Sequence, residues 1–357
     1  MRLGILGRYL LREAAGALVA VTLVLLAIMI SAQFARYLAQ AAGGTLPKNL
    51  LLSVVALTSL QYLMILIPFS ALMAVMLTLG RLYKDQEIAA MNGCGVGGGR
   101  LYRPFLMLAL GMALLAGAFS FQIGPWAGRQ ADFLLKDGRW LVQFNPFEAG
   151  RFKEVGGGRA MFYTDRVDDD GNQLGMVFGE LQDEDGTSAL TARSGRYTQD
   201  ADGSRHLILE DGWRFQGEPG KGEYDITHYK TLTSRIQLPE FVYKSEARKV
   251  RPTLELLASR DPADRAEWHW RLASPISVFL MILIAVPLSH IAPRQGRYGK
   301  LVIGIVVYLL YSNLLTFGQT YLAKGKLPEA LGLWWIHALA GALALALIAK
   351  REGWLRR

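Results

Sequence analysis

The stretch RLYKDQEIAAMNGCGVGGGR, residues 81–100, gathers charged side chains and glycines between two long apolar runs. Its glycines spell G-x-G-x-x-G from Gly93 to Gly98, the spacing with which a nucleotide-binding loop approaches a pyrophosphate. That chemistry requires a strand before the loop and a helix after it, within a soluble βαβ unit. Here a helical pattern precedes the glycines and a run long enough to cross a membrane follows them. The pattern therefore argues against dinucleotide binding.

The other residues that could do chemistry form no catalytic constellation. GEPGKGE at 217–223 lacks the Ser or Thr of a phosphate-binding P-loop, and the acidic turn from Asp168 has Gln173 where a calcium-binding EF-hand loop needs glycine. Cys94 is the only cysteine, which excludes an intrachain disulfide and a thiolate cluster. We expect no catalytic residue, no metal site and no cofactor. The histidines are scattered without metal-binding spacing: His206, His228, His269, His290 and His337.

The elements that position these residues follow from composition and charge. Of the 357 residues, 52% are hydrophobic, and the mean hydropathy is +0.22, more apolar than is usual for a soluble domain. The net charge of +9 is unevenly distributed, because residues 125–270 hold 20 Lys and Arg against 25 Asp and Glu, whereas the rest of the chain holds 19 against 5. The basic charge accompanies the apolar segments, which indicates a membrane protein and not a nucleic-acid-binding protein.

Six segments without Asp, Glu, Lys or Arg reach the length of about 20 residues that a helix needs to cross a bilayer. The first is longer than the apolar core of a signal peptide and five others follow it, so we expect it to remain as a span. Pro68 and Pro287 predict kinks in the second and fourth spans. The six segments are 14–34, 50–80, 104–128, 272–293, 301–323 and 330–349.

The distribution of Lys and Arg near the span ends predicts the orientation. One side carries 14 such residues, and the short loops of the other side carry 4, namely Arg36, Lys48, Lys324 and Lys326. Both termini and the 81–100 loop are therefore expected in the cytoplasm, and the insert between spans three and four is expected to face outward. The predicted organisation is three spans in 1–124, an external domain in 125–270, and three spans with a cytoplasmic tail in 271–357.

The insert has the signals of β-structure. Short segments of alternating polarity, such as 206–210 and 224–228, lie between turn signals and predict an antiparallel β-sandwich or open roll. The aromatic-rich flanks 121–152 and 253–271 are predicted to form helical collars at the membrane surface. The turn signals are DDDG (168–171), DEDG (183–186), DADG (200–203) and EDG (210–212).

Residues of about 80–93 are predicted to form one short cytoplasmic helix. Lys84 and Glu87 can pair weakly as i, i+3 neighbours. Asn92-Gly93 predicts the helix stop, because glycine readily adopts the left-handed conformation, and the next glycines, Gly95 among them, turn the chain back into span three. Such a helix can transmit a push from a nucleotide-driven partner through Glu87, or it can simply be a solvated turn. Its expected apolar side is Leu79, Leu82, Tyr83 and Met91.

Four segments together resemble the LptF/LptG family, the permease subunits of the lipopolysaccharide-export ABC transporter. The resemblance covers nearly the whole chain and implies an α-helical integral membrane protein with six transmembrane helices. It also implies a periplasmic antiparallel β-jellyroll domain inserted between helices three and four. The segments are LGRLYKDQEIAAMNGCG (79–95), AEWHWRLASPISVF (266–279), VPLSHIAPRQGR (286–297) and AKGKL (323–327).

The resemblance further implies a non-enzymatic subunit of the bacterial inner membrane. Its partners would be an LptG-like sister permease, an LptB-like ATPase dimer that alone binds ATP, and LptC-like and LptA-like periplasmic proteins that receive lipopolysaccharide. The coupling helix of the family matches residues of about 80–93, with Tyr83, Lys84 and Met91, and its functional glutamate matches Glu87.

A family arginine that binds lipid phosphates at the outer end of span one matches Arg36. A guanidinium at headgroup level suits a phosphorylated sugar, although simple interfacial anchoring is the alternative. Some relatives carry a second basic residue one turn earlier, where this chain has Gln33. The resemblance then implies that headgroup binding leans on the sister subunit, or on Lys324 and Lys326.

The expected function is extraction of lipopolysaccharide from the outer leaflet of the inner membrane and its delivery to a periplasmic protein bridge. The resemblance implies that ATP binding closes the ATPase dimer and moves the coupling helix, and that spans one and five then narrow a cavity shared with the sister permease. Two alternatives stay open, a structural or assembly protein whose β-domain binds periplasmic partners, and a permease for another lipid. A membrane enzyme ranks last, because the predicted spans contain no Asp, Glu, Lys or Arg.

Overall fold

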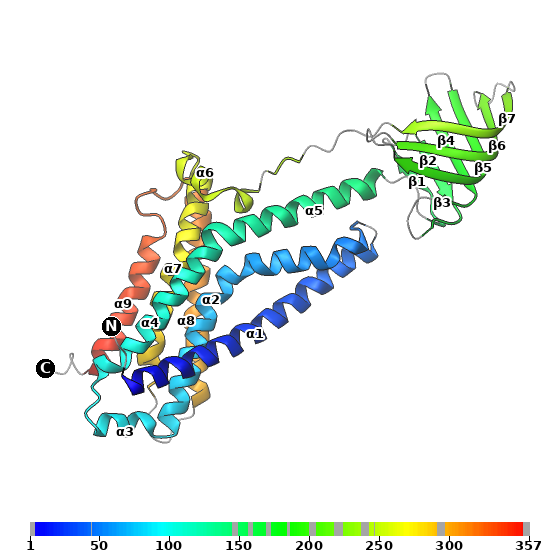
Figure 1. Cartoon of the computed structure of the whole chain (residues 1–357). Helices are drawn as coiled ribbons and strands as arrows, with labels where there is room; N and C mark the ends of the chain where they lie inside the picture. The colour runs from blue at the N-terminus through cyan, green and yellow to red at the C-terminus, as the bar shows by residue number, and fades with distance from the viewer. Residues whose placement is uncertain are drawn as a thin grey trace. The chain divides into compact units, whose positions relative to one another are not determined.

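The computed structural model describes residues 4–43, 45–144, 149–155, 160–168, 173–183, 186–199, 205–217, 224–236, 243–245, 247–290 and 297–352. The chain divides into two compact units (Figure 1). The helical unit comprises Met1–Ala39, Asn49–Leu134 and Ser245–Arg357, and the β unit comprises Gln40–Lys48 and Leu135–Lys244.

Nine α-helices are present among the described residues. The predicted helical collars correspond to α5 and to α6 with the start of α7. The sequence predicts domain limits at 125 and 270, close to the start of α5 (Gly124–Phe144) and within α7 (Pro262–Leu288). The helices are α1 (Ile5–Ala42), α2 (Leu51–Lys84), α3 (Glu87–Gly93), α4 (Gly98–Ala118), α5 (Gly124–Phe144), α6 (Thr253–Ala258), α7 (Pro262–Leu288), α8 (Arg297–Ala323) and α9 (Trp334–Glu352).

Three shorter segments complete the helical part. Lys48–Leu50 and Arg248–Val250 are single 3₁₀ turns. Phe119–Ile123 is a π-helix that joins α4 to α5, so that Gly99–Trp140 runs as one continuous helical rod. A π-bulge of this kind widens the helix locally and leaves backbone groups that other side chains can contact.

Five helices among the described residues are long and apolar enough to cross a membrane: Ile5–Ala42, Lys48–Lys84, Gly99–Trp140, Pro262–Leu288 and Gly299–Ala323. They correspond to the first five predicted spans. The sixth predicted segment corresponds to α9, a helix of 19 residues whose last turn carries Lys350 and Arg351. The chain is therefore a helical membrane protein, as predicted.

Helix α7 lies at the centre of the helical unit, where it contacts α2, α4, α8 and α9. In the most apolar window of each helix, 61% of α7 residues are buried, against 22% for α8 and 11% for α1. Large apolar side chains such as Leu23 and Ile28 on α1, and Leu310 and Phe317 on α8, are exposed. These two helices present the apolar surface that lipid or a partner must cover.

Prolines lie inside three of the described helices, and in two of these, α2 and α7, a hydroxyl group of a neighbouring element compensates. Pro68 in α2 cannot donate to the carbonyl of Met64, and Ser274 of α7 donates to that carbonyl at 2.8 Å. Pro275 in α7 likewise frees the carbonyl four residues earlier, and Ser120 of the π-helix donates to it at 2.7 Å. These bonds satisfy backbone groups where water is scarce, and they join α7 to its neighbours.

The β unit holds one antiparallel sheet among the described residues, with strand order β1-β2-β4-β5-β6-β7 and β3 paired with β5. The antiparallel β-domain between α5 and α7 is thus confirmed, and its described strands form a meander, not two separate sheets (Figure 1). The strands are β1 (Lys153–Val155), β2 (Ala160–Thr164), β3 (Gln173–Leu174), β4 (Val177–Asp183), β5 (Gly186–Gln199), β6 (Arg205–Gly217) and β7 (Tyr224–Ile236).

The turn predicted at 210–212 is wrong, because these residues lie inside β6. Asp211 has a left-handed φ of 52°, and a Cβ on Gly212 would overlap the carbonyl of Thr191 and the hydroxyl of Tyr229. Aspartate tolerates the left-handed conformation and glycine avoids the clash, so β6 can bend while its pairing continues on both sides. The predicted turns at 168–171, 183–186 and 200–203 lie wholly or partly outside the described residues.

The core of the β unit lies on one face of this sheet and includes Phe162, Val177, Leu190 and Leu209. Tyr229 closes it at the bend and donates from its hydroxyl to the carbonyl of Thr191 at 2.7 Å. Burial raises the pKa of the Tyr229 phenol above its ordinary value.

Candidate functional site

The predicted coupling helix is two helices with a break between them. Helix α2 continues to Lys84, and α3 begins at Glu87. Between them Gln86 has a φ of 62°, and the N–H groups of Asp85 and Gln86 bond back to carbonyls of the last turn of α2. The left-handed residue redirects the chain, so α3 is a separate seven-residue element at the end of the membrane helix. We name residues 79–96, from the end of α2 through α3, the coupling turn.

The predicted apolar side of the coupling turn lies against the core of the helical unit. Leu82 is fully buried, Tyr83 and Met91 are half-buried, and Lys84 is exposed. Ile88, which the sequence analysis did not single out, is 1% exposed and anchors α3. The sequence feature that could have identified this anchor is an isolated aliphatic residue next to Glu87 in a polar stretch.

The predicted helix stop is a Schellman motif centred two residues later than expected. Gly93 is the last residue of α3, but the left-handed residue is Gly95, with a φ of 78°. The N–H of Gly95 donates to the carbonyl of Asn92, and the N–H of Val96 donates to the carbonyl of Met91, both at 3.0 Å. Gly95 is therefore the residue whose missing side chain the turn requires.

Glu87 is held by α1 and not by its neighbour Lys84, with which no ion pair forms among the described residues. The hydroxyl of Tyr9 donates to Oε2 of Glu87 at 2.8 Å. Nη2 of Arg81 lies 3.0 Å from Oε2 of Glu13 and donates to the Tyr9 hydroxyl at 3.4 Å. The sequence analysis missed Tyr9, Glu13 and Arg81, although Tyr9 and Glu13 share one face of α1 at i, i+4 spacing.

The other side of the coupling turn contacts the end of α9. Arg351 donates to the Tyr83 hydroxyl at 2.9 Å, and its guanidinium lies 5.5 Å from the ring centroid of Tyr102. The His290 ring meets Tyr83 edge-on at 5.2 Å. Partial burial lowers the pKa of His290, and the positive charges of Arg351 and Lys300 lower it further.

The residues predicted to contact lipid lie apart from the coupling turn. Arg36, near the C-terminal end of α1, is exposed, stacks 4.8 Å from the Tyr37 ring centroid and donates to its hydroxyl at 3.0 Å. The amide oxygen of Gln33 is buried without a partner among the described residues. Lys324 and Lys326 are exposed between α8 and α9, and the described contacts do not bring them to Arg36.

A buried polar network lies where the chain returns to the membrane helices, and the sequence analysis missed it. Arg271 of α7 is 1% exposed. It donates to Thr253 Oγ1 at 2.7 Å, to the carbonyls of Arg251 and Lys249 at 2.9 and 3.1 Å, and pairs with Glu267 Oε1 at 3.4 Å. One guanidinium thus fixes the return segment to α7, and we name this set the Arg271 clamp.

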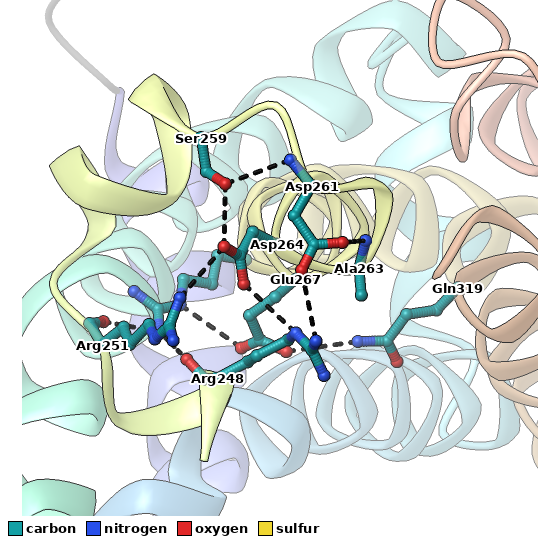
Figure 2. A network of polar contacts seen from close by, with 9 residues as sticks. Arg248, Arg251, Ser259, Asp261, Ala263, Asp264, Glu267 and Gln319 are labelled. Atoms are coloured by element: carbon teal, nitrogen blue, oxygen red, sulfur yellow. Dashed lines mark hydrogen bonds and ion pairs between the residues drawn. The ribbon is translucent and has the colours of Figure 1, made fainter. Parts of the chain in front are cut away.

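A second ion cluster extends the clamp (Figure 2). The buried carboxylate of Asp264 contacts Arg248 at 3.2 Å and Arg251 at 3.1 Å, and it accepts from Ser259 at 2.8 Å. Asp261 caps α7 by accepting a bond from the backbone N–H two residues later, at 3.0 Å. That hydrogen bond, reinforced by Arg248, lowers the pKa of Asp261.

Two charged residues of α7 closely precede the apolar run that was predicted as the fourth span. Glu267 and Arg271 lie in the candidate span Pro262–Leu288, because α7 begins ten residues before the predicted apolar run. They pair with each other, and Gln319 of α8 donates to Glu267 at 3.3 Å (Figure 2). A satisfied ion pair of this kind holds helices in place and offers no free acid or base. The i, i+4 spacing of the pair is the signal that could have found it.

A cavity of about 420 Å³ borders the clamp between α2, the π-helix, α7 and α8. Gln61, Glu267, Trp270, Asn313 and Thr316 are among its lining residues, so its wall is both polar and apolar. No group of three or more His, Cys, Asp or Glu that could hold a metal occurs in the part of the chain that the structure describes.

Comparison with known proteins identifies a family for this arrangement. Residues 8–350 match the model of the family described as lipopolysaccharide export system permease LptF/LptG. The lipopolysaccharide export system permease protein LptF of Escherichia coli strain K12 is 29% identical over 343 residues, which cover 95% of this chain and 93% of the relative. The protein of the same name from Shigella flexneri matches with the same identity and coverage.

Proposed function

Because the chain belongs to the LptF/LptG family of lipopolysaccharide export system permeases, we propose that its coupling turn receives the movement of a separate ATPase. The chain is a permease subunit of the lipopolysaccharide export system, a multi-pass membrane protein of a non-catalytic family. ATP is then bound by an LptB-like dimer, and an LptG-like sister permease completes the membrane part.

The observation that supports this role most strongly is the way α3 presents Glu87. Ile88 anchors α3 to the core, while the neighbouring Lys84 and Asp85 are exposed, so the element is fixed on one side and open on the other. Helices α2 and α4 leave the coupling turn directly toward the core. A cation of the ATPase that binds Glu87 can therefore displace α2 and α4 together.

The lipid-binding role belongs to Arg36 in this proposal. Its guanidinium stacks on Tyr37 and donates one N–H to that hydroxyl, and the residue is exposed. A guanidinium presents up to five N–H donors and binds phosphate in a bidentate manner, as a lipopolysaccharide headgroup requires. The excess of Lys and Arg at the opposite span ends supports a periplasmic location for this end of α1.

Substitution at the coupling turn tests the proposal. In a complex co-expressed with its sister permease and ATPase, Glu87→Ala is expected to reduce ATPase copurification and lipopolysaccharide transfer at least tenfold, because a charge-assisted contact is lost. Asp85→Ala is the matched control, since Asp85 is an exposed acid two residues away. Full assembly and transfer in Glu87→Ala would refute the coupling role.

Two further measurements address the lipid site and the orientation. Arg36→Ala should weaken photo-crosslinking of lipopolysaccharide to α1, whereas Lys48→Ala should not. Unchanged crosslinking would leave Arg36 only an anchoring role. A reporter fused after Arg357 should be active in the cytoplasm, and periplasmic activity would reverse the proposed orientation.

A further inference from the structure

The packing of helix α1 on the helical unit is concentrated near its N-terminal end. Leu10, Ala14 and Leu18 are its residues in the main core cluster, and all lie in its first four turns. Only 11% of its most apolar window is buried. A helix held in this way can pivot on its first turns without breaking a core along its length.

Those first turns carry the polar contacts to the coupling turn. Tyr9 and Glu13 lie one turn apart on α1, and they meet Glu87 and Arg81 respectively, at 2.8 and 3.0 Å. Arg81 also donates to the Tyr9 hydroxyl at 3.4 Å, so the four side chains form one chain of contacts from Glu13 to Glu87. We name these four residues the α1 latch.

The latch joins α1 to the same carboxylate that the proposed function assigns to the ATPase. Oε2 of Glu87 accepts from Tyr9, and Oε1 has no partner among the described residues. A carboxylate has enough lone pairs to accept from both sides at once. A cation of the ATPase and the Tyr9 hydroxyl can therefore hold Glu87 together, and a displacement of α3 is carried to α1.

The guanidinium of Arg81 is not fully satisfied in this arrangement. Its Nε is buried without an acceptor among the described residues, while Nη2 makes both contacts of the latch. An unused buried donor raises the free energy of the present arrangement. It therefore favours a small shift of Arg81 when α3 moves.

Helix α1 then transmits the shift over its length. It is continuous from Ile5 to Ala42 and contains no proline. At a rise of about 1.5 Å per residue, Arg36 lies about 40 Å along the helix axis from Tyr9. A small rotation at the latch becomes a larger displacement at Arg36.

We propose that Tyr9 and Glu13 are positioning residues that couple the movement of the coupling turn to α1, through hydrogen bonding to Glu87 and pairing with Arg81. This inference rests on the proposed function of Glu87. The opposite contact, Arg351 on Tyr83, fixes the coupling turn to the end of α9. The α1 latch and the α9 contact therefore attach the same turn to a largely exposed helix and to a helix that contributes residues to the core.

The test uses the complete complex in proteoliposomes, with lipopolysaccharide as substrate and a periplasmic acceptor protein outside. Tyr9→Phe keeps the ring and removes the hydroxyl. We expect the ATPase to copurify as in wild type, ATP hydrolysis to stay within twofold, and lipopolysaccharide transferred per ATP to fall about tenfold. If Tyr9 had only a structural role, the substitution would reduce ATPase copurification and ATP hydrolysis as well. Lipopolysaccharide transferred per ATP would then stay near the wild-type value.

A charge exchange provides the second arm. Glu13→Arg and Arg81→Glu should each lower transfer per ATP, and the double variant should return it to within threefold of wild type, because the pair is restored in reverse. Arg12→Gln is the matched control, since Arg12 neighbours Glu13 on α1 but is exposed. It is expected to transfer as wild type.

Several results would overturn the latch. These are unchanged transfer per ATP in Tyr9→Phe, loss of ATPase copurification in that variant, no recovery in the double variant, or an equal fall in Arg12→Gln. The proposed function is read separately from Glu87→Ala. If Glu87→Ala loses ATPase copurification and transfer while Tyr9→Phe keeps the wild-type transfer per ATP, only the latch is wrong. If both variants assemble and transfer as wild type does, the role of Glu87 is wrong too.

Discussion

The coupling turn and the Arg271 clamp are both polar contact networks of the helical unit, yet they are built on opposite principles. In the clamp, Arg271 is 1% exposed and its contacts are satisfied by Glu267, Thr253 and backbone carbonyls. At the contact between the coupling turn and α1, the side chains of Arg81 and Glu13 are 42% and 34% exposed, and Nη2 of Arg81 contacts both Glu13 and Tyr9. A buried charge must keep all its partners, whereas a half-exposed one can exchange them with water or another protein.

The difference indicates which network is fixed and which can move. The clamp joins α7 to the return segment through the buried side chains of Arg271 and Glu267, so separating the two segments would leave a buried charge without its partner. Within the coupling turn, α3 is seven residues long, and Ile88 is its buried residue. The first network defines the frame of the permease, and the second is suited to receive a movement.

Breaking the clamp should have the largest effect. Arg271→Ala leaves the Glu267 carboxylate buried without its partner, and we expect a loss of about 3–5 kcal/mol in stability. Thermal unfolding in detergent, followed by size-exclusion chromatography, would measure it. The double variant Arg271→Met with Glu267→Leu removes both charges and should recover most of the loss. If Arg271→Ala unfolds as wild type does, the clamp does not hold the frame.

Substitution of two glycines of the coupling turn should have an intermediate effect on stability. Gly95→Ala places a side chain at a φ of 78°, in open space, so the cost is backbone strain of about 1 kcal/mol. Gly93→Ala is the matched control, since Gly93 ends α3 without a left-handed φ and should be neutral or slightly stabilising. Gly95→Ala should therefore lower both the ATPase copurification and the temperature of thermal unfolding more than Gly93→Ala does. Equal behaviour would contradict the Schellman geometry.

The smallest expected effect is a pH dependence at the coupling turn. The pKa of His290 is lowered in the folded protein, so protonation is disfavoured there and favoured in the unfolded chain. The stability linked to His290 is complete above its unfolded pKa of about 6.5 and falls as the pH drops below that value. His290 is exposed, so water screens the effect.

The measurement compares melting temperatures at pH 7.5 and 5.5. The wild-type protein should lose slightly more stability on acidification than His290→Gln, which cannot gain the charge beside Arg351 and Lys300. A larger loss in His290→Gln would show that another group controls the acid response.

The sequence by itself determined the features that depend on local composition. Apolar runs without charge predict membrane helices wherever they occur, because a bilayer selects for length and hydropathy alone. Alternating polarity in the insert predicted antiparallel β-structure, and the glycines after Asn92 predicted the end of α3. The resemblance, carried by motifs in the right order, supplied the lipopolysaccharide substrate.

Contacts between distant residues were decided only by the tertiary structure. Tyr9 and Glu87 are 78 residues apart in sequence, and no pattern near either one predicts their bond. Arg271 likewise needs the carbonyls of a return segment that its own helix does not contain. Hydroxyl caps on proline-freed carbonyls, such as Ser274 on Met64, also depend on which helices pack together. Local sequence determines the backbone conformation and the hydropathy of a segment. The hydrogen-bond partner of a side chain depends on how the helices of the whole unit pack together.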